Sequence, residues 1–472
     1  MTCNLTFRAA AEIIGLALSA LSMVYLSRIV GPEIVGLSAV TSSLLLFLSR
    51  LADGGLTSLA TQRLARDDAR LDALLAITMP PKLVVSAALV AFSVLVAERL
   101  PIDSRLKYFI SISIFAICID ACTPAWVFVA MGRIKILSMT RITQSLLAAT
   151  AVFIFIHEPA DWIYLPYLTL VNSLGSLGLS VFCLYRSGLC HFNGGLFDRD
   201  HLEIIRTYYR EAFHFLKADL SVYIYLSSDR IFLYYFSNPY TVGLYEAAYK
   251  IIYPFYRISD VVTPTMFRSL AQGFKQKQIH QVMSTYVFAM SFLTIPLGFF
   301  LFYFSDRIVA LLYGPQFIEC VPCLMILGFV ITFGFMSGII VIPFSAWNMS
   351  REYGNSILSG NIANLALNFA LIPMFGAVGA ALATLGAKLI VTAVGLTYFR
   401  RVTDYPIVRD LSSFVLASVV PLLLVLICSV FVSNDNLNLA IYGSAYFLLI
   451  AGMYLHRFQL VGKLIDPEIL SR

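Results

Sequence analysis

Long hydrophobic runs follow one another along almost the whole chain, and short polar or Gly- and Pro-containing joints separate them. Each run is about 20 residues long, the length that a helix needs to cross a hydrocarbon core of roughly 30 Å. The pattern therefore predicts an all-α, polytopic membrane protein with about fourteen transmembrane helices. We expect these helices at residues 7–28, 35–58, 75–97, 107–130, 137–156, 162–185, 213–237, 243–267, 283–304, 321–346, 355–374, 377–398, 411–432 and 438–456.

Several joints between these runs are only two or three residues long, namely Gly31-Pro32, Asn238-Pro239 and Phe375-Gly376-Ala377. Gly, Pro and Asn in such positions are typical of tight turns. We expect the helices that they join to pack as antiparallel neighbours.

Composition supports a membrane protein. Of the 472 residues, 59% are hydrophobic and 13% are charged, and the mean hydropathy is +0.82. This is more apolar surface than one or two soluble cores could bury. The start of the chain lacks a charged segment followed by a short apolar stretch and a small-residue cleavage site, so we expect the first helix to be a retained span.

Lys and Arg are concentrated in alternate loops, about four to one over the intervening loops. The poorer set holds only Arg28, Arg99, Arg105, Lys107 and Arg307. The positive-inside rule makes the richer loops and both termini cytoplasmic. The net charge of +6 follows from these loops and does not indicate nucleic-acid binding.

The longest connection, residues 186–212, contains Gly194-Gly195 and then an aromatic and apolar stripe that is typical of an interfacial helix. It divides the chain into an N-lobe of six helices (1–185), this linker, a C-lobe of six helices (213–400), and helices thirteen and fourteen with a tail (401–472). An even number of spans before the linker predicts parallel lobes related by a pseudo-two-fold axis along the membrane normal.

A weak internal repeat agrees with that arrangement. At an offset of 207 residues, Pro32, Val35, Gly36, Leu37, Arg50 and Asp53 fall on Pro239, Val242, Gly243, Leu244, Arg257 and Asp260, and Glu12 falls on Asp219. The matches are few, but they suggest two related halves.

Charged residues occur inside the predicted helices, where each costs about 2.5–3.5 kcal/mol to insert. Arg50 with Asp53, Glu246 with Lys250, and Arg257 with Asp260 have spacings that allow pairing along one helix face. One interpretation is mutual neutralisation, with Lys82 reaching the headgroups. The other is a water-filled cleft whose cations bind a phosphate or pyrophosphate. Its candidate cations are Arg28, Arg50, Lys250 and Arg257; the candidate coupling or charge-balancing acids are Glu12, Asp53, Asp219, Asp229, Glu246 and Asp260.

Asn361, Asn364 and Asn368 share one face of a predicted helix. They suit either hydrogen bonding between helices or a sugar-binding face. The eight Cys and six His residues form no metal-ligand or catalytic pattern, so we expect buried free thiols, no metal and no enzyme. The acids leave open coupling to a proton or sodium gradient.

Several stretches together resemble the polysaccharide transporter branch of the multidrug/oligosaccharidyl-lipid/polysaccharide exporter superfamily, the O-antigen type flippases. They are LSRIVGPEIVGL, LADGGLTSLATQRLA, SDRIFLYYFSNPYTVGLYEAAYK, LLYGPQF and NLALNFALIPMFGAVGAALAT, and the resemblance spans about residues 5–400. It implies a V-shaped, two-lobe fold that moves an undecaprenyl-diphosphate-linked oligosaccharide to the periplasmic leaflet by alternating access. Arg28 and Arg50 match the cavity arginines of the related lipid II flippases, although the motif around Arg50 differs.

The resemblance implies a lipid-linked oligosaccharide substrate, a setting of membrane lipids, and the polysaccharide polymerase and chain-length machinery as candidate partners. Two alternatives remain open at this point. One is a cation-coupled multidrug exporter of the same superfamily, which would favour an acidic cavity. The other is a membrane-embedded glycan-processing enzyme, which usually carries catalytic residues on a large outer loop, and here no predicted outer loop exceeds about twenty residues.

Overall fold

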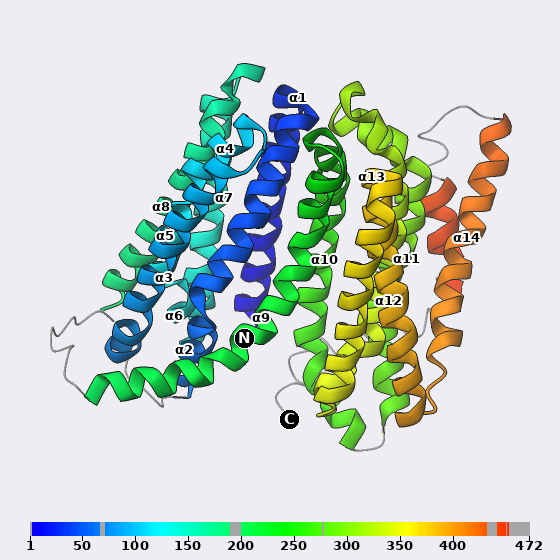
Figure 1. Cartoon of the computed structure of the whole chain (residues 1–472). Coiled ribbons are helices and arrows are strands. Elements are labelled where there is room, and N and C mark those ends of the chain that lie inside the picture. Colours follow the sequence, from blue (N-terminus) through cyan, green and yellow to red (C-terminus); the bar gives the residue numbers. More distant parts are fainter. Residues whose placement is uncertain are drawn as a thin grey trace. The chain divides into compact units, whose positions relative to one another are not determined.

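The computed structural model describes residues 2–66, 71–188, 200–275, 278–431, 441–449 and 451–452, and in these residues every regular element is a helix (Figure 1). The predicted all-α membrane fold is confirmed. Eight of the described helices are long and apolar enough to cross a membrane. The chain forms two compact units, residues 1–246 and 247–472.

The first unit begins with α1 (Thr2–Asp53), which is two helices joined at Gly31. Gly31 has a φ of 77°, a conformation that glycine adopts at no steric cost, and Pro32 follows it. The turn predicted at Gly31-Pro32 is therefore present. Figure 1 shows the first half of α1 rising to this turn and the second half descending from it.

A second break was not predicted. Gly54 and Gly55 have φ values of 61° and 78°, and they separate α1 from α2 (Leu56–Ala65). The predicted uninterrupted helix over 35–58 is wrong because two consecutive left-handed residues end the helical hydrogen bonding.

The predicted helix over 107–130 is also interrupted, at Ile114-Phe115 and at Cys122–Pro124. Pro124 lacks an amide donor and disfavours helical backbone in the residue before it, which explains the second break. The remaining helices of this region are α3 (Leu71–Arg99), α4 (Ser104–Ser113), α5 (Ala116–Ala121), α6 (Ala125–Ala130), α7 (Ile134–Phe155), η1 (Pro159–Tyr164) and α8 (Leu165–Arg186).

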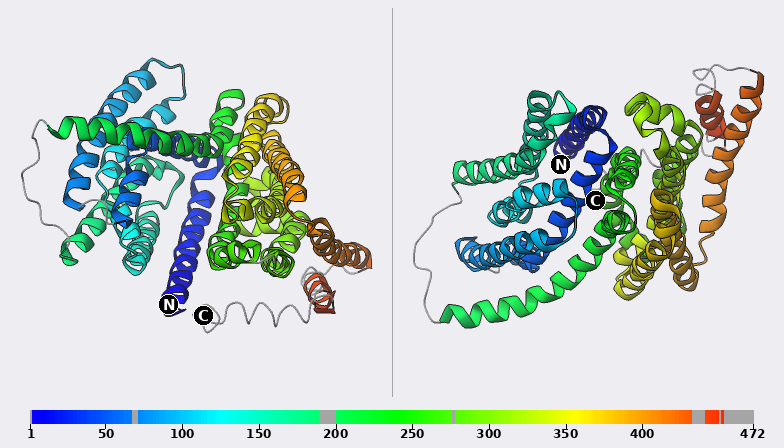
Figure 2. Two further views of the ribbon diagram at one scale, coloured as in Figure 1. Left: turned by 90° about the horizontal axis from the view of Figure 1, so that it is seen from below. Right: turned by 45° about the horizontal axis from the view of Figure 1, so that its top comes forward.

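Two long, charged helices follow, α9 (Asp200–Phe236) and α10 (Pro239–Lys275). The linker and the seventh span were predicted as separate helices, but α9 runs through both without a break. Figures 1 and 2 show its first part crossing beneath α2 and its remainder rising beside α1. Residues 189–199 of the predicted linker lie outside the described residues.

A hydrophobic core holds α9 against α2. Leu56, Ala60, Trp126, Tyr208 and Ala212 are among its buried members. A Cβ on Gly55 would lie 2.3 Å from the carbonyl oxygen of Ala212, so only glycine fits at this approach. Arg63 adds an ion pair with Glu211 at 2.6 Å. The first part of α9 is thus fixed to the end of α1 and α2 that we predict to be cytoplasmic.

The 207-residue repeat corresponds to a physical contact within the first unit. A Cβ on Gly36 would lie 1.8 Å from the carbonyl oxygen of Pro239, and a Cβ on Gly243 would lie 1.8 Å from that of Pro32. Small residues let helix backbones approach this closely. The two contacts are reciprocal, with each glycine facing the proline of the other helix, as a local two-fold axis requires.

The second unit holds the rest of α10 and an apolar bundle. Gly376 (φ 54°) divides α13, so the predicted turn at Phe375-Gly376-Ala377 is present. Gly298 and Gly328 allow a close approach of α11 and α12, because a Cβ on either would lie within 2.8 Å of the other helix. The elements after α10 are α11 (Ile279–Leu312), η2 (Pro315–Cys320), α12 (Val321–Ala346), α13 (Ser350–Val402), α14 (Ile407–Phe431) and a helical segment at 441–449.

Candidate functional site

Arg50 lies in the last turn of α1, just before the Gly54-Gly55 break. Its guanidinium carbon is 4.6 Å from the centre of the Tyr223 ring on α9. A cation over an aromatic face gains about 0.5–2 kcal/mol, the more so when water is excluded. The residue is half-buried, and its Nε is enclosed without a hydrogen-bond partner in the described part of the chain. Arg50 is therefore oriented by a ring and retains an unsatisfied donor.

Asp53 does not pair with Arg50, the neighbour that the spacing suggested. Its Oδ1 lies 2.6 Å from Nζ of Lys82 on α3, and both side chains are mostly buried. Lys82 also donates to the hydroxyl of Thr57, which in turn donates to Asp53. The prediction that Lys82 reaches the headgroups is wrong, because this residue is 5% exposed and its charge is paired inside the unit.

Two further acids lie within electrostatic range of Arg50. Asp120 is on α5, and Asp219 is on α9 one turn before Tyr223. Asp219 is half-buried and lies beside Ser58 of α2. The end of the unit around the Gly54-Gly55 break thus holds a cluster of two cations and three acids on four helices, which we call the Arg50 cluster: Arg50, Asp53, Lys82, Asp120 and Asp219.

A second buried cluster joins α9 to the start of α10. Nε of Arg230 donates to Oε2 of Glu246 at 2.6 Å, and the hydroxyl of Tyr245 donates to Oδ2 of Asp229 at 2.7 Å. Asp229 and Glu246 are 6% and 5% exposed. We call these four residues the Arg230 cluster. Glu246 forms an ion pair with Arg230 of the neighbouring helix, and its expected pairing with Lys250 stays a prediction.

The sequence carried a signal for this second cluster. Arg230 and Glu246 are equally distant from Asn238, and Asn238-Pro239 forms the turn between the two helices. In a pair of antiparallel helices, residues equidistant from the turn lie side by side. Asn238 fixes that turn by accepting hydrogen bonds at 2.9 Å from both the backbone amide and the hydroxyl of Thr241.

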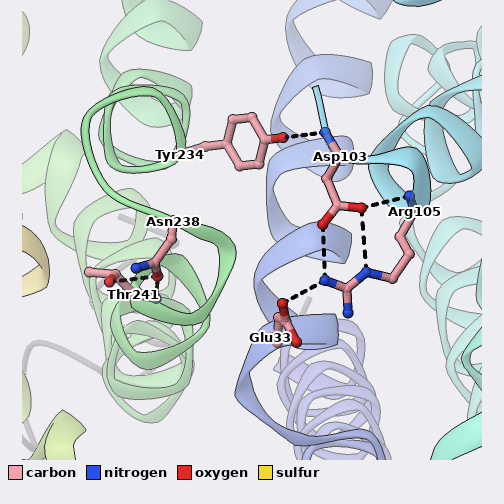
Figure 3. Close-up of polar contacts among 6 residues, drawn as sticks. All are labelled: Glu33, Asp103, Arg105, Tyr234, Asn238 and Thr241. Atoms are coloured by element: carbon pink, nitrogen blue, oxygen red, sulfur yellow. Dashed lines mark hydrogen bonds and ion pairs between the residues drawn. The ribbon is translucent and has the colours of Figure 1, made fainter. Parts of the chain in front are cut away.

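A polar network near the Gly31 turn joins α1, α4 and α9 of the first unit (Figure 3). Arg105 donates to Glu33 at 2.6 Å and to Asp103 at 2.9 Å, and the Asp103 amide donates to the hydroxyl of Tyr234 at 3.3 Å. The hydrogen bond from Arg105 holds the pKa of the Asp103 carboxyl below its usual range. Arg28, a candidate cation, is exposed and lies one turn before Gly31.

The remaining charged candidates are less fully described. Lys250 is exposed on α10. Arg257 and Asp260 lie within α10, and Glu12 lies within α1, but their side chains fall outside the described set. The structure therefore brings Arg50, Asp53 and Asp219 together, and it leaves the predicted pair of Arg257 and Asp260 a prediction.

Asn364 and Asn368 are 1% and 0% exposed on α13. The Asn368 amide donates to the Asn364 side-chain oxygen at 3.1 Å, and Asn361 is half-buried. In this conformation neither Asn364 nor Asn368 is accessible to a sugar. Among the described residues, no group of three or more His, Cys, Asp or Glu side chains could hold a metal ion.

Comparisons with known proteins place these features in context. A family model described as polysaccharide biosynthesis protein matches residues 2–269. A putative O-antigen transporter of Escherichia coli (strain K12) is 21% identical over 390 residues, covering 80% of this chain and 92% of the relative. The lipid II flippase MurJ in an inward closed conformation superposes with a TM-score of 0.77 at 14% identity, over 97% of this chain and 99% of MurJ.

A multidrug resistance MATE family transporter in an inward-facing conformation also superposes. The TM-score is 0.63 at 12% identity, over 84% of this chain and 98% of the transporter. At these identities the two structures establish the fold that the chain shares with them.

Proposed function

We propose that this chain, which belongs to the polysaccharide biosynthesis protein family, is a flippase for an undecaprenyl-diphosphate-linked oligosaccharide. The substrate is an O-antigen unit or another surface polysaccharide repeat unit, and alternating access carries it from the cytoplasmic to the periplasmic leaflet of the inner membrane. The name of the E. coli relative, putative O-antigen transporter, supports this assignment, as does the fold shared with a lipid II flippase.

The geometry of Arg50 is the observation that carries the proposal. Its Nε is buried without a partner in the described residues, and leaving such a donor unsatisfied costs about 1–3 kcal/mol, or more when it is charged. The guanidinium fork matches phosphate geometry, and a phosphate oxygen would satisfy this donor once the alternating-access motion opens the site. The Tyr223 ring holds the guanidinium in place before a ligand arrives. A diphosphate is thus the ligand that this site suits.

The pairing of the acids favours an anionic substrate over the alternative, a cationic drug. Asp53 is held by Lys82, and Glu246 is held by Arg230. Asp229 accepts from Tyr245. A cation-binding cavity needs carboxylates that a ligand can reach, whereas these three are occupied within the protein. Asp219, half-buried and close to Arg50, is our candidate for charge balance or for coupling to a proton or sodium gradient.

The other candidate cations keep their roles as predictions. Lys250 and Arg257 lie on α10, and Arg28 lies next to the turn at Gly31. In the predicted orientation, Arg50 is nearer the cytoplasmic entrance and Arg28 is nearer the periplasmic exit. The sugar would occupy the space beyond the diphosphate.

The test is surface glycan in a host strain that depends on this protein. Arg50→Ala and Lys250→Ala should each reduce surface glycan at least about tenfold, since a hydrogen bond to a charged group contributes about 1.5–3 kcal/mol. Membrane levels of both variants should equal the parent level. Normal glycan in both variants at equal protein level would refute the cationic site.

Arg63→Ala is the matched control. Arg63 also lies over a tyrosine ring, Tyr208, at 4.8 Å, but its guanidinium is already paired with Glu211. We expect this variant to keep normal surface glycan. A loss of surface glycan equal to that of Arg50→Ala would mean that any cation at this end of the unit can support transport. It would exclude a specific role of Arg50.

A further inference from the structure

Lys82 has no role in the proposed phosphate contact, yet it is the most buried cation of the Arg50 cluster. It lies in the first half of α3 and is 5% exposed. Its ammonium contacts Oδ1 of Asp53 at 2.6 Å and the hydroxyl of Thr57. Burying a lysine charge at this position costs free energy, and such a charge is usually retained where it serves a function.

The carboxylate of Asp53 is held on both of its oxygens. Oδ1 forms an ion pair with Lys82 and accepts from the Thr57 hydroxyl, and Oδ2 accepts from the Thr57 amide at 3.3 Å. That amide belongs to the first turn of α2, whose start is set by the Gly54-Gly55 break. Asp53 is thus directed toward α2 and α3.

Arg50 is the partner that Asp53 would otherwise take. The two residues are three apart on α1, a spacing at which Arg and Asp side chains meet on a helix surface. Arg50 also offers a buried Nε that has no hydrogen-bond partner in the described residues. A carboxylate released from Lys82 would satisfy that donor, and it would occupy the position that a phosphate oxygen needs.

We infer that Lys82 is a positioning residue: by holding Asp53 against α2 and α3, it keeps the Arg50 guanidinium on Tyr223 and available to a phosphate group. This inference rests on the proposed function, because it assumes that Arg50 binds phosphate. Lys82 itself does not touch the ligand. Its effect passes entirely through the Asp53 carboxylate.

The experiment measures binding of farnesyl diphosphate, a lipid diphosphate, to the purified full-length protein in detergent by calorimetric titration. Lys82→Met should weaken binding at least about tenfold, because Asp53 then pairs with Arg50. Adding Asp53→Asn to that variant should restore the affinity to within about threefold of the parent, since an amide cannot neutralise the guanidinium. If Lys82 served only helix packing, adding Asp53→Asn would not restore the affinity while the thermal stability stayed unchanged.

Two results would overturn the inference. One is normal affinity in Lys82→Met, and the other is a double variant that folds like the parent but binds as weakly as Lys82→Met. If Lys82→Met does not accumulate, Asp53→Asn is compared with Asp53→Asn/Lys82→Met. Equal affinities support the inference, because the carboxylate that Lys82 restrains is absent from both variants, and a weaker double variant contradicts it by making Lys82 a direct ligand.

The Arg50→Gln variant shows whether a negative result refutes only this inference or also the proposed function. If Arg50→Gln binds farnesyl diphosphate as tightly as the parent, the phosphate role of Arg50 is wrong and the role of Lys82 falls with it. If Arg50→Gln loses binding while Lys82→Met retains it, the phosphate role stands and only the positioning role is refuted.

Discussion

The Arg50 cluster and the Arg230 cluster place charges inside the same unit, but they hold their cations differently. Arg230 donates its Nε to Glu246 at 2.6 Å, and the neighbouring Asp229 accepts from Tyr245. Arg50 lies over a ring, its Nε has no hydrogen-bond partner in the described residues, and the nearest acid along the helix is held by Lys82. One cluster is internally satisfied, and the other retains a donor.

This difference distinguishes charges that stabilise the packing of helices from charges that remain available to bind a ligand. Buried ion pairs fix the pairing of elements, because losing one partner leaves the other charge uncompensated. A cation supported by an aromatic ring adds little to folding but keeps its hydrogen-bonding capacity. Measurements of stability and of transport should therefore divide between the two clusters.

The largest stability effect is expected at the Arg230 cluster. Arg230→Met removes the Nε donor to buried Glu246 and should lower the free energy of unfolding by about 3–5 kcal/mol. Arg50→Met is the matched control, and it should change that free energy by less than about 2 kcal/mol because only the ring contact is lost. Thermal unfolding of both purified variants measures the difference; equal destabilisation would remove the distinction between the clusters.

An intermediate loss of stability is expected for Tyr245 of the Arg230 cluster. Tyr245→Phe removes the hydroxyl that donates to Asp229, and a lost hydrogen bond to a charged group should cost about 1.5–3 kcal/mol of stability. Tyr223→Phe keeps the ring beneath Arg50 and should leave both stability and surface glycan unchanged. A loss of glycan in Tyr223→Phe would show that the hydroxyl, and not the ring, serves Arg50.

The smallest loss of stability is expected at the Arg105 network of Figure 3. The Arg105 and Glu33 side chains are 35% and 48% exposed, and pairs at such exposure contribute about 0–1 kcal/mol. Arg105→Gln should therefore shift the unfolding free energy by less than about 1 kcal/mol and leave surface glycan normal. A larger shift in thermal unfolding would mean that this network, like the Arg230 cluster, holds helices together.

The sequence predicted the features that depend on local chemistry. Hydrophobic runs placed the helices, and glycine placed the turns at Gly31 and Gly376, because a positive φ is a property of the residue itself. The break at Gly54-Gly55 was missed although it carries the same signal, since the apolar run continues through it.

The pairing of charges depended on contacts that spacing along one helix does not reveal. Asp53 had a nearby candidate, Arg50, but its partner Lys82 comes from another helix. Arg230 and Glu246 could have been paired from their equal distance to the Asn238-Pro239 turn. The cations inside the predicted helices could thus be identified from the sequence. Identifying the partner of each one required knowing how α1, α3, α9 and α10 pack.

The contact between Gly36 and Gly243 has a mechanical consequence. Two bare backbones meet there, with Pro32 and Pro239 supplying the opposing carbonyl groups. Such a contact limits how closely the helix starts approach, because at these two positions no side chain separates the backbones. A larger residue at either position would therefore have to push the two helix starts apart, so these glycines set the minimum distance between them.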